Sequence, residues 1–431
     1  MNPNRHRNYI VATIFIAIVC NYLDRQLLSI LKPEILTSFN VGDLEYAWIV
    51  NVFLICYALM YPVGGMLIGR FGSRKVMFGG ILLWSLACIG GGISRNIAEF
   101  TFFRGLLGIA EPIIFSGQVV VVTVWFEKQK RALANSLCQF GGSIGAMIAP
   151  AVIAWLSHYL PWNQVFIIAG LIGIIISLIW FMIYSEPPKE ILDQSTAAES
   201  GDDGKTDEWA FSLKDLFKTR SLWGCLLVRL VSDPVWYFCS FWLPGFLRTM
   251  GERQGLSQQQ TLDMIQYIGG IPFLVGAISG VLASAISDRM VRHGTPSLLA
   301  RKKIMLASVI FAPLCALVPY VSEWQGIGFN ARLALVIIIF CLIAAMCLTW
   351  LYNIGVVMAE SFPLPNVSTV VGIACGAGAI GGSVFNQLVG SMLNTMGNKL
   401  FFIMSLLHII AAFVLWKMVR REPKPEEVKA N

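Results

Sequence analysis

Six ionisable side chains lie within long apolar stretches of this sequence, and they occur as three pairs. The pairs are Asp24 with Arg25, Arg104 with Glu111, and Arg229 with Asp233. On an α-helix, residues four or seven positions apart lie on one face, so the second and third pairs can each point into a single space. Because a charge in the middle of a bilayer costs about 3 kcal/mol or more, such residues usually face a partner or a watery cavity, which indicates a path for ions or substrates.

The arginines among these residues indicate recognition of an anion. A planar guanidinium matches a carboxylate and stays protonated even where it is partly buried. We expect Arg25 to bind the carboxylate directly, and Arg104, at a similar depth, to face the same site or to act as a gate beside Glu111. Arg229 and Asp233 either belong to the binding site or lock helices together, and the sequence leaves both interpretations open.

A carboxyl group that couples a proton to transport must exist in both charged and neutral forms inside the membrane. Loss of water favours the neutral form and a neighbouring cation favours the charged form, so a buried carboxyl beside an arginine can be poised between the two. Glu111, near the middle of its apolar stretch, fits this role best, and Asp24 is the second candidate.

Aromatic and polar side chains in other apolar stretches could contact the hydroxyl groups of a bound molecule. These candidates are Tyr57, Gln139, Ser143, Trp350 and Asn353. They offer ring faces and hydrogen-bonding edges at plausible depths. Each could equally be a packing residue, so its place in a substrate site is a hypothesis.

The elements that must position these residues are membrane-spanning helices. The 431 residues are 56% hydrophobic and 13% charged, with a mean hydropathy of +0.68, whereas about a quarter of the residues in soluble domains are charged. Twelve apolar stretches of about 20 residues are each long enough to cross a hydrocarbon core of about 30 Å. We place them at 8–31, 45–69, 75–94, 98–124, 131–156, 161–185, 220–248, 262–287, 303–321, 332–359, 364–394 and 399–419. The sequence therefore predicts an all-α membrane protein.

Several other classes of protein are disfavoured by what the sequence contains. Most of the ten cysteines lie in apolar stretches and the four histidines are scattered, so we expect no disulfide framework, metal site or cofactor. The phosphate-binding pattern Gly-x-x-x-x-Gly-Lys-(Ser/Thr) does not occur, which argues against a nucleotide-driven pump. A channel would need a filter-like loop or a repeated acidic ring, and an enzyme would need a catalytic cluster or a larger polar domain.

One long polar stretch divides the chain into two halves of six spans. We expect an N-terminal half at 1–185, a cytoplasmic linker at 186–219 with a short helix near 209–217, and a C-terminal half at 220–431. Most lysines and arginines outside the spans then fall on the linker's side of the membrane, which puts both termini in the cytoplasm. This asymmetry accounts for the net charge of +7 without any nucleic-acid binding.

Two loop motifs resemble the signature of the major facilitator superfamily. The segments are Gly65-Met-Leu-Ile-Gly69-Arg70-Phe-Gly72-Ser-Arg74-Lys75 and Ser284-Ala-Ile-Ser-Asp288-Arg289. The chain departs from the family pattern at Gly69, where Asp is usual, and at Ser284, where Gly is usual. The resemblance implies two six-helix halves with a central cavity, as in transporters built from parallel repeats.

Further motifs resemble the anion:cation symporter branch of that superfamily. They are Tyr22-Leu-Asp24-Arg25, Arg104 followed by Glu111, Gly145-Ala-Met-Ile-Ala-Pro150, and Arg229-Leu-Val-Ser-Asp233-Pro234-Val-Trp236, the last of which is similar to hexuronate transporters. In that branch, the positions of Asp24 and Glu111 are proton-titrating carboxylates and the position of Arg25 binds substrate. The positions of Tyr57 and Trp350 also contact substrate there.

The resemblance implies a secondary transporter, not an enzyme, that imports an organic anion by proton symport and alternating access. The expected substrate is a sugar acid such as a hexuronate, while an aldonate, a dicarboxylate, an aromatic acid or another coupling cation remain alternatives. We expect a monomer in a bacterial inner membrane, whose partners are the organic anion, the proton and bilayer lipid.

Overall fold

The computed structural model describes residues 3–126, 128–186 and 211–421, and nearly all of them are helical. The helices of the first part of the chain are α1 (Pro3–Ile30), α2 (Lys32–Phe39), α3 (Asp43–Phe71), α4 (Ser73–Ile93), α5 (Ile97–Ala110), α6 (Pro112–Trp125), α7 (Lys128–Ser157) and α8 (Trp162–Ile183). Those of the second part are α10 (Leu213–Leu216), α11 (Arg220–Phe241), α12 (Leu243–Arg253), α13 (Gln258–Ile268), α14 (Ile271–Arg292), α15 (Ser297–Ser308), the 3₁₀ turn η1 (Val309–Phe311), α16 (Leu314–Ser322), α17 (Phe329–Ser361) and α18 (Leu364–Met418).

The described residues contain twelve helical segments long and apolar enough to cross a membrane, which confirms the predicted number. Several spans are not single straight helices. The fourth breaks at Glu111, where Pro112 opens a new helix because its missing N–H is tolerated at a first turn. The eighth breaks at Gly269 and Gly270 between α13 and α14.

The chain forms two compact units that are not continuous in sequence. Unit 1 comprises residues 1–204 and 240–270, and unit 2 comprises residues 205–239 and 271–431. Residues 240–270, which hold the last two residues of α11 together with α12 and α13, therefore pack with the first six spans. The predicted linker lies mostly outside the described residues. Its described end contains α10, capped by the Ser212 hydroxyl.

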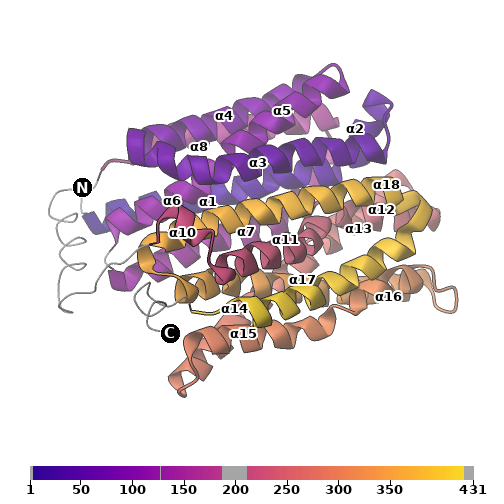
Figure 1. Ribbon diagram of the computed structural model, residues 1–431. Coiled ribbons are helices and arrows are strands. Elements are labelled where there is room, and N and C mark those ends of the chain that lie inside the picture. Colours follow the sequence, from indigo (N-terminus) through magenta and orange to yellow (C-terminus); the bar gives the residue numbers. More distant parts are fainter. Residues whose placement is uncertain (1–2, 127, 187–210, 422–431) are drawn as a thin grey trace, which may run out of the picture. The chain divides into compact units, whose positions relative to one another are not determined.

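In unit 1, α4 lies along α8, α3 lies along α5, and α1 lies along α7 (Figure 1). The start of α4 is held to the end of α8 by Arg74, whose Nε and Nη2 donate to the carbonyl of Phe181 at 3.0 and 2.8 Å. Trp180 returns a bond from its indole N–H to the Arg74 carbonyl at 3.2 Å. The guanidinium thus satisfies a carbonyl at the helix end that has no partner within its own helix.

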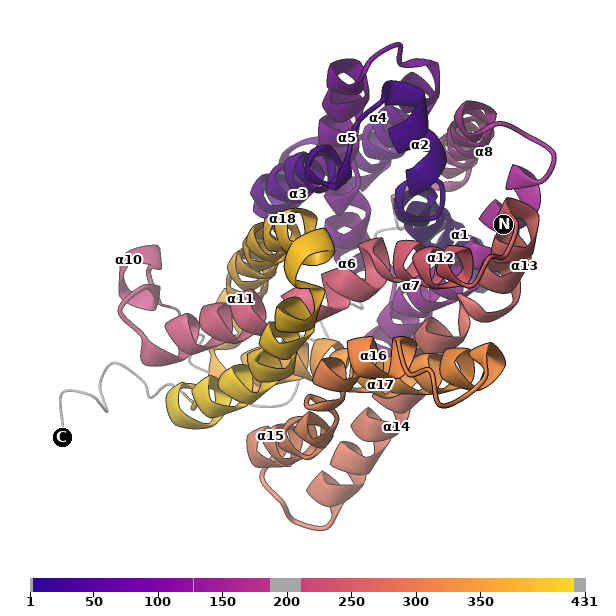
Figure 2. The same cartoon turned by 90° about the vertical axis from the view of Figure 1, so that its right-hand side faces the viewer.

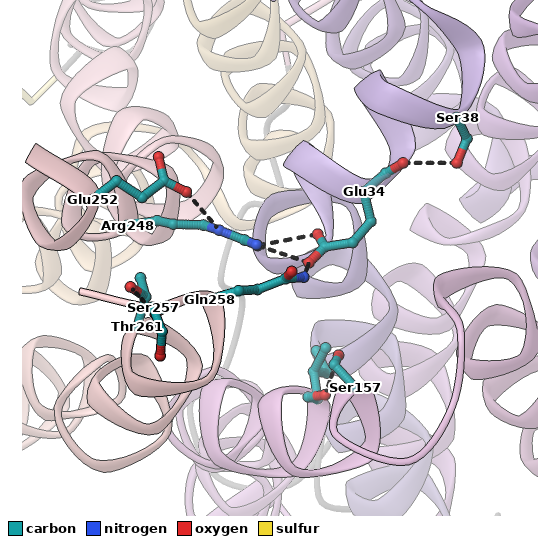
Figure 3. A network of polar contacts seen from close by, with 9 residues as sticks. Glu34, Ser38, Ser157, Arg248, Glu252, Ser257, Gln258 and Thr261 are labelled. Atoms are coloured by element: carbon teal, nitrogen blue, oxygen red, sulfur yellow. Dashed lines mark hydrogen bonds and ion pairs between the residues drawn. The ribbon is translucent and has the colours of Figure 1, made fainter. Parts of the chain in front are cut away.

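A polar network binds residues 240–270 to the rest of unit 1 (Figure 3). Arg248 of α12 donates from Nη1 to both carboxylate oxygens of Glu34 of α2, at 2.9 and 3.1 Å, and from Nε to Glu252 at 3.3 Å. Gln258 of α13 adds a bond to Glu34 at 3.4 Å. Arg248 is buried, so its bond to Glu34 is better shielded from water than an ordinary surface pair.

Lys32, at the start of α2, strengthens the same attachment. Its Nζ lies 2.5 Å from Asp43 Oδ1 and over the rings of Tyr46 and Trp242, at 4.6 and 4.3 Å from their centroids. Burial lowers the pKa of the Lys32 amine, while Asp43 opposes that shift. The Tyr46 hydroxyl also donates to the carbonyl of Phe241 at 2.6 Å.

In unit 2, α14 lies along α17, and α15 and α16 also pack against α17 (Figure 2). Arg301 of α15 pairs with Asp288, the carboxylate of the second loop motif. The same guanidinium donates to the Ser284 carbonyl at 3.2 Å. The second motif is therefore held by the ion pair of Asp288 with Arg301, whereas Arg74 of the first motif is held by bonds to the Phe181 carbonyl.

Candidate functional site

The charged residues of the first six spans meet in the interior of unit 1. Arg25, on α1, donates from Nε to Oε2 of Glu111 at 2.6 Å. Glu111 lies at the junction of α5 and α6, and its side chain has no exposed surface, while that of Arg25 is 13% exposed. A buried ion pair of this kind joins α1 to the broken fourth span.

Four aromatic rings surround the Arg25 guanidinium. Its Cζ lies 4.7 Å from the ring centre of Tyr57, 5.1 Å from Tyr22, and 5.7 Å from both Phe53 and Phe115. Rings attract a cation through their faces and replace part of its hydration shell. The cage therefore holds a charged guanidinium at a fixed place with one carboxylate as its partner. Tyr57, predicted to contact substrate, is one wall of it.

Arg104 is buried close to this pair but does not bond to Glu111. The sequence interpretation paired the two because seven residues make two turns of a continuous helix. The Glu111 N–H still bonds to the Leu107 carbonyl, so the helical spacing holds and the two side chains interact electrostatically, but the hydrogen bond of the Glu111 carboxylate goes to Arg25. Arg104 Cζ lies 5.2 Å from the ring centre of Phe53, and its Nε and Nη2 have no hydrogen-bond partner among the described residues.

Asp24 is buried on α1 and interacts electrostatically with Glu111 and Arg104. Among the described residues it forms no ion pair with Arg25, because neighbours on a helix point about 100° apart. Asn21 was not identified from the sequence, yet it is fully buried one turn before Arg25 and interacts with the Glu111 carboxyl. Its spacing of three and four residues from Asp24 and Arg25 was the available signal.

The pair in unit 2 has the geometry that its spacing predicts. Arg229 Nη2 lies 2.9 Å from Asp233 Oδ2 on the same face of α11, and both side chains are about nine-tenths buried. Arg229 also approaches the Sγ of Cys375 on α18 at 3.6 Å, and the Ser232 hydroxyl donates to Asp233 at 3.3 Å. A Cβ at Gly378 would overlap the Asp233 carboxylate, so this glycine lets α18 approach the pair closely.

The remaining candidates differ in how accessible they are. On α7, Gln139 is exposed and Ser143 is half-buried. On α17, the Trp350 indole donates to the Met305 carbonyl at 3.0 Å and is buried. Asn353 is fully buried and donates to the Thr349 carbonyl at 2.8 Å.

Trp350 and Asn353 thus already have bonds inside unit 2. The Trp350 N–H also reaches the Ser308 hydroxyl at 3.1 Å, and Asn353 accepts from Arg301 at 3.4 Å. A substrate hydroxyl would have to displace these bonds. Their role in binding remains a prediction, as does that of Gln139 and Ser143.

Within the ranges that the structure describes, no three His, Cys, Asp or Glu side chains are grouped so that they could hold a metal ion.

Comparison with known proteins defines the class. The family model of the Major Facilitator Superfamily matches residues 14–353, and the chain belongs to this family. Its fold is that of a multi-pass helical membrane transporter, not of an enzyme. The crystal structure of a D-xylose-proton symporter is similar over 96% of this chain and 98% of that chain, with a TM-score of 0.75 and 16% sequence identity.

Curated relatives indicate the neighbourhood within the family. The chain is 28% identical over 349 residues to a probable galactarate/D-glucarate transporter, GudP, of Escherichia coli (strain K12), which covers 75% of this chain and 76% of that protein. It is 23% identical over 430 residues to the hexuronate transporter of the same organism, which covers 97% of this chain and 95% of that protein.

Proposed function

We propose that this protein is a secondary active transporter that imports a sugar acid together with protons. The observation that carries the proposal is the buried Arg25–Glu111 ion pair inside its aromatic cage. It is a fixed cation whose only ion-pair partner among the described residues is a group that can be neutralised by a proton. The curated relatives named for sugar acids support the substrate class.

The pair suggests how proton and anion binding are coupled. While Glu111 is ionised, it occupies Arg25, and a substrate carboxylate would meet an already neutralised guanidinium. Protonation of Glu111 removes that competitor, so Arg25 becomes available for the substrate, and the proton and the anion together leave the buried charge unchanged. Binding of each therefore favours binding of the other, which is the linkage that symport requires.

Asp24 and Arg104 complete the electrostatics of this cluster. Two carboxyls and two guanidiniums balance when all are charged, so uptake of one proton leaves an excess positive charge for an anion. Asp24, which has no ion-pair partner among the described residues, is the second proton acceptor. Arg104 contributes positive potential from α5, and its Nε and Nη2 have no hydrogen-bond partner among the described residues.

The proposed substrate is a hexuronate, while an aldarate such as galactarate, an aldonate, a dicarboxylate or an aromatic acid are the alternatives. The Tyr57 hydroxyl and the polar groups of Gln139 and Ser143 are proposed to contact its hydroxyls. Arg229 is also proposed to contribute positive charge to anion binding. We place the protein as a monomer in a bacterial inner membrane with both termini in the cytoplasm.

Uptake into proteoliposomes tests the proposal. Labelled galacturonate, glucuronate, galactarate and galactonate are presented with an inward proton gradient, with and without a protonophore, and with a sodium gradient alone. We expect one of these acids to accumulate and the protonophore to collapse the accumulation. Accumulation that requires the sodium gradient and is unaffected by the protonophore would replace the proton by another cation. Uptake of none of the acids would overturn the substrate class.

A further inference from the structure

A buried amide beside the central ion pair has no role in the scheme above. Asn21 lies on α1 one turn before Arg25, and its side chain has no exposed surface. Neither its Nδ2 nor its Oδ1 makes a hydrogen bond of normal geometry to any described residue. A buried polar group left without such a bond is destabilising, so it calls for a physical explanation.

The Glu111 carboxyl has a complementary unused atom. Its Oε2 accepts from Arg25, while Oε1 is buried and has no hydrogen-bond partner among the described residues. The Asn21 amide interacts with this carboxyl. An amide with both a donor and an acceptor therefore faces a carboxyl with one oxygen available.

An asparagine amide can serve both charge states of a carboxyl. It donates from Nδ2 to an ionised oxygen, and after a half-turn about its terminal bond it accepts on Oδ1 from a protonated one. Leucine, of similar size, can do neither. Aspartate would add a third negative charge to the two of Asp24 and Glu111.

We propose that Asn21 is a positioning residue that holds the Glu111 carboxyl in one orientation in both of its charge states, by turning its amide when Glu111 takes up or releases a proton. The inference rests on the proposed function for its consequence in transport. The Asn21 amide is a partner that Glu111 keeps when the substrate carboxylate binds Arg25. The protonated carboxyl then stays aligned for release of its proton.

Other groups that act electrostatically on Glu111 could influence its proton exchange. They are Asp24 and Arg25 on α1, Tyr57 on α3, Cys88 on α4 and Arg104 on α5. Each remains unchanged in an Asn21 variant, which isolates the amide.

The test compares Asn21→Leu with wild type in two measurements. Infrared difference spectra of the purified protein, between acid and alkaline buffer, contain the C=O band of protonated Glu111, identified as the band lost in Glu111→Gln. We expect this band to move to higher wavenumber in Asn21→Leu, since its carboxyl loses a hydrogen bond. In transport, the pH of half-maximal uptake should rise by about one unit, because the charged carboxyl loses the stronger bond.

Asn366→Leu is the matched control, because it also removes a buried amide, one that donates to the Phe211 carbonyl at 3.0 Å. Its Glu111 band and uptake profile should equal those of wild type. If Asn21→Leu does not fold, Asn21→Ala, which adds no bulk, is measured in the same way. An unmoved Glu111 band in the folded variant overturns the proposal. If wild type shows no proton-driven uptake, the proposed function fails, and the infrared comparison still decides the role of Asn21.

Discussion

The two charged pairs of this protein differ in what they connect. Arg25 and Glu111 are 86 residues apart and join α1 to the junction of α5 and α6. Arg229 and Asp233 are four residues apart on α11. The first pair changes whenever α1 moves against the fourth span, whereas the second moves as one body with its helix. Only the first can respond to helix rearrangement, and the second presents a constant group of charges.

The two arginines also differ in the groups that surround them. Arg25 lies in an aromatic cage with a single carboxylate partner, and unsatisfied polar atoms of Asn21 and Arg104 are nearby. Arg229 has a carboxylate on its own helix and a thiol on α18. The Arg25 pair therefore depends on contacts between helices, whereas the carboxylate partner of Arg229 lies on its own helix.

The largest effect is expected from Arg25→Ala. It removes the anion's partner and leaves Glu111 buried without one, so apparent substrate affinity should fall by about 100-fold or more and stability by about 3–5 kcal/mol. Titration calorimetry and thermal unfolding measure the two quantities. The double variant Arg25→Ala with Glu111→Gln separates them, because it should recover stability but not affinity. Near-wild-type affinity in either variant would remove Arg25 from the site.

Glu111→Gln is expected to abolish accumulation while keeping substrate exchange. The amide mimics the protonated carboxyl, so Arg25 remains available to the anion but no proton can be carried. Counterflow and gradient-driven uptake in the same proteoliposomes measure the two modes. Accumulation against a gradient by this variant would transfer the coupling role to another group, with Asp24 the first to examine through Asp24→Asn.

In unit 2, each single change at the pair is expected to destabilise the protein by about 3 kcal/mol, because the remaining charge is buried alone. The double variant Arg229→Met with Asp233→Leu should recover the unfolding temperature. If Arg229 belongs to the anion site, as we propose, the recovered protein should bind substrate several-fold more weakly. Unchanged apparent affinity in the double variant would instead make the pair structural and complete the contrast with Arg25.

Gly378→Ala tests whether the close approach of α18 fixes the second pair. Its methyl group would overlap the Asp233 carboxylate, so we expect a loss of about 1–3 kcal/mol in stability from overpacking. Gly355→Ala, on α17, is the matched control, since a Cβ there meets nothing within 4 Å, and it should be neutral or slightly stabilising. Equal stability of the two variants would show that α18 can move away from the pair without destabilising the protein.

The smallest effect is expected from Glu34→Gln in the polar network of Arg248, Glu252 and Gln258. The Glu34 side chain is 20% exposed, so its bond to Arg248 is only partly shielded from water, and Arg248 keeps Glu252 as a partner. A loss of roughly 1 kcal/mol or less is expected in thermal unfolding, with a matching decrease on adding salt to wild type. A loss as large as that of Arg229→Met would show that this network behaves as a buried pair.

The sequence by itself determined what is local. Hydrophobic length set the twelve spans, because each must cross the same bilayer core. The four-residue spacing of Arg229 and Asp233 sufficed to predict their ion pair, because one helical turn brings them together whatever surrounds the helix.

The tertiary structure decided which distant residues meet. The packing of α1 against the fourth span brought Arg25 to the Glu111 carboxylate, and Asn21 interacts with the same carboxyl. Contacts of α17 with α15 occupied the polar atoms of Trp350 and Asn353, although their residue types had suggested a substrate lining. Such partners depend on how helices pack, and side-chain periodicity along a single helix carries no information about the helix that lies opposite.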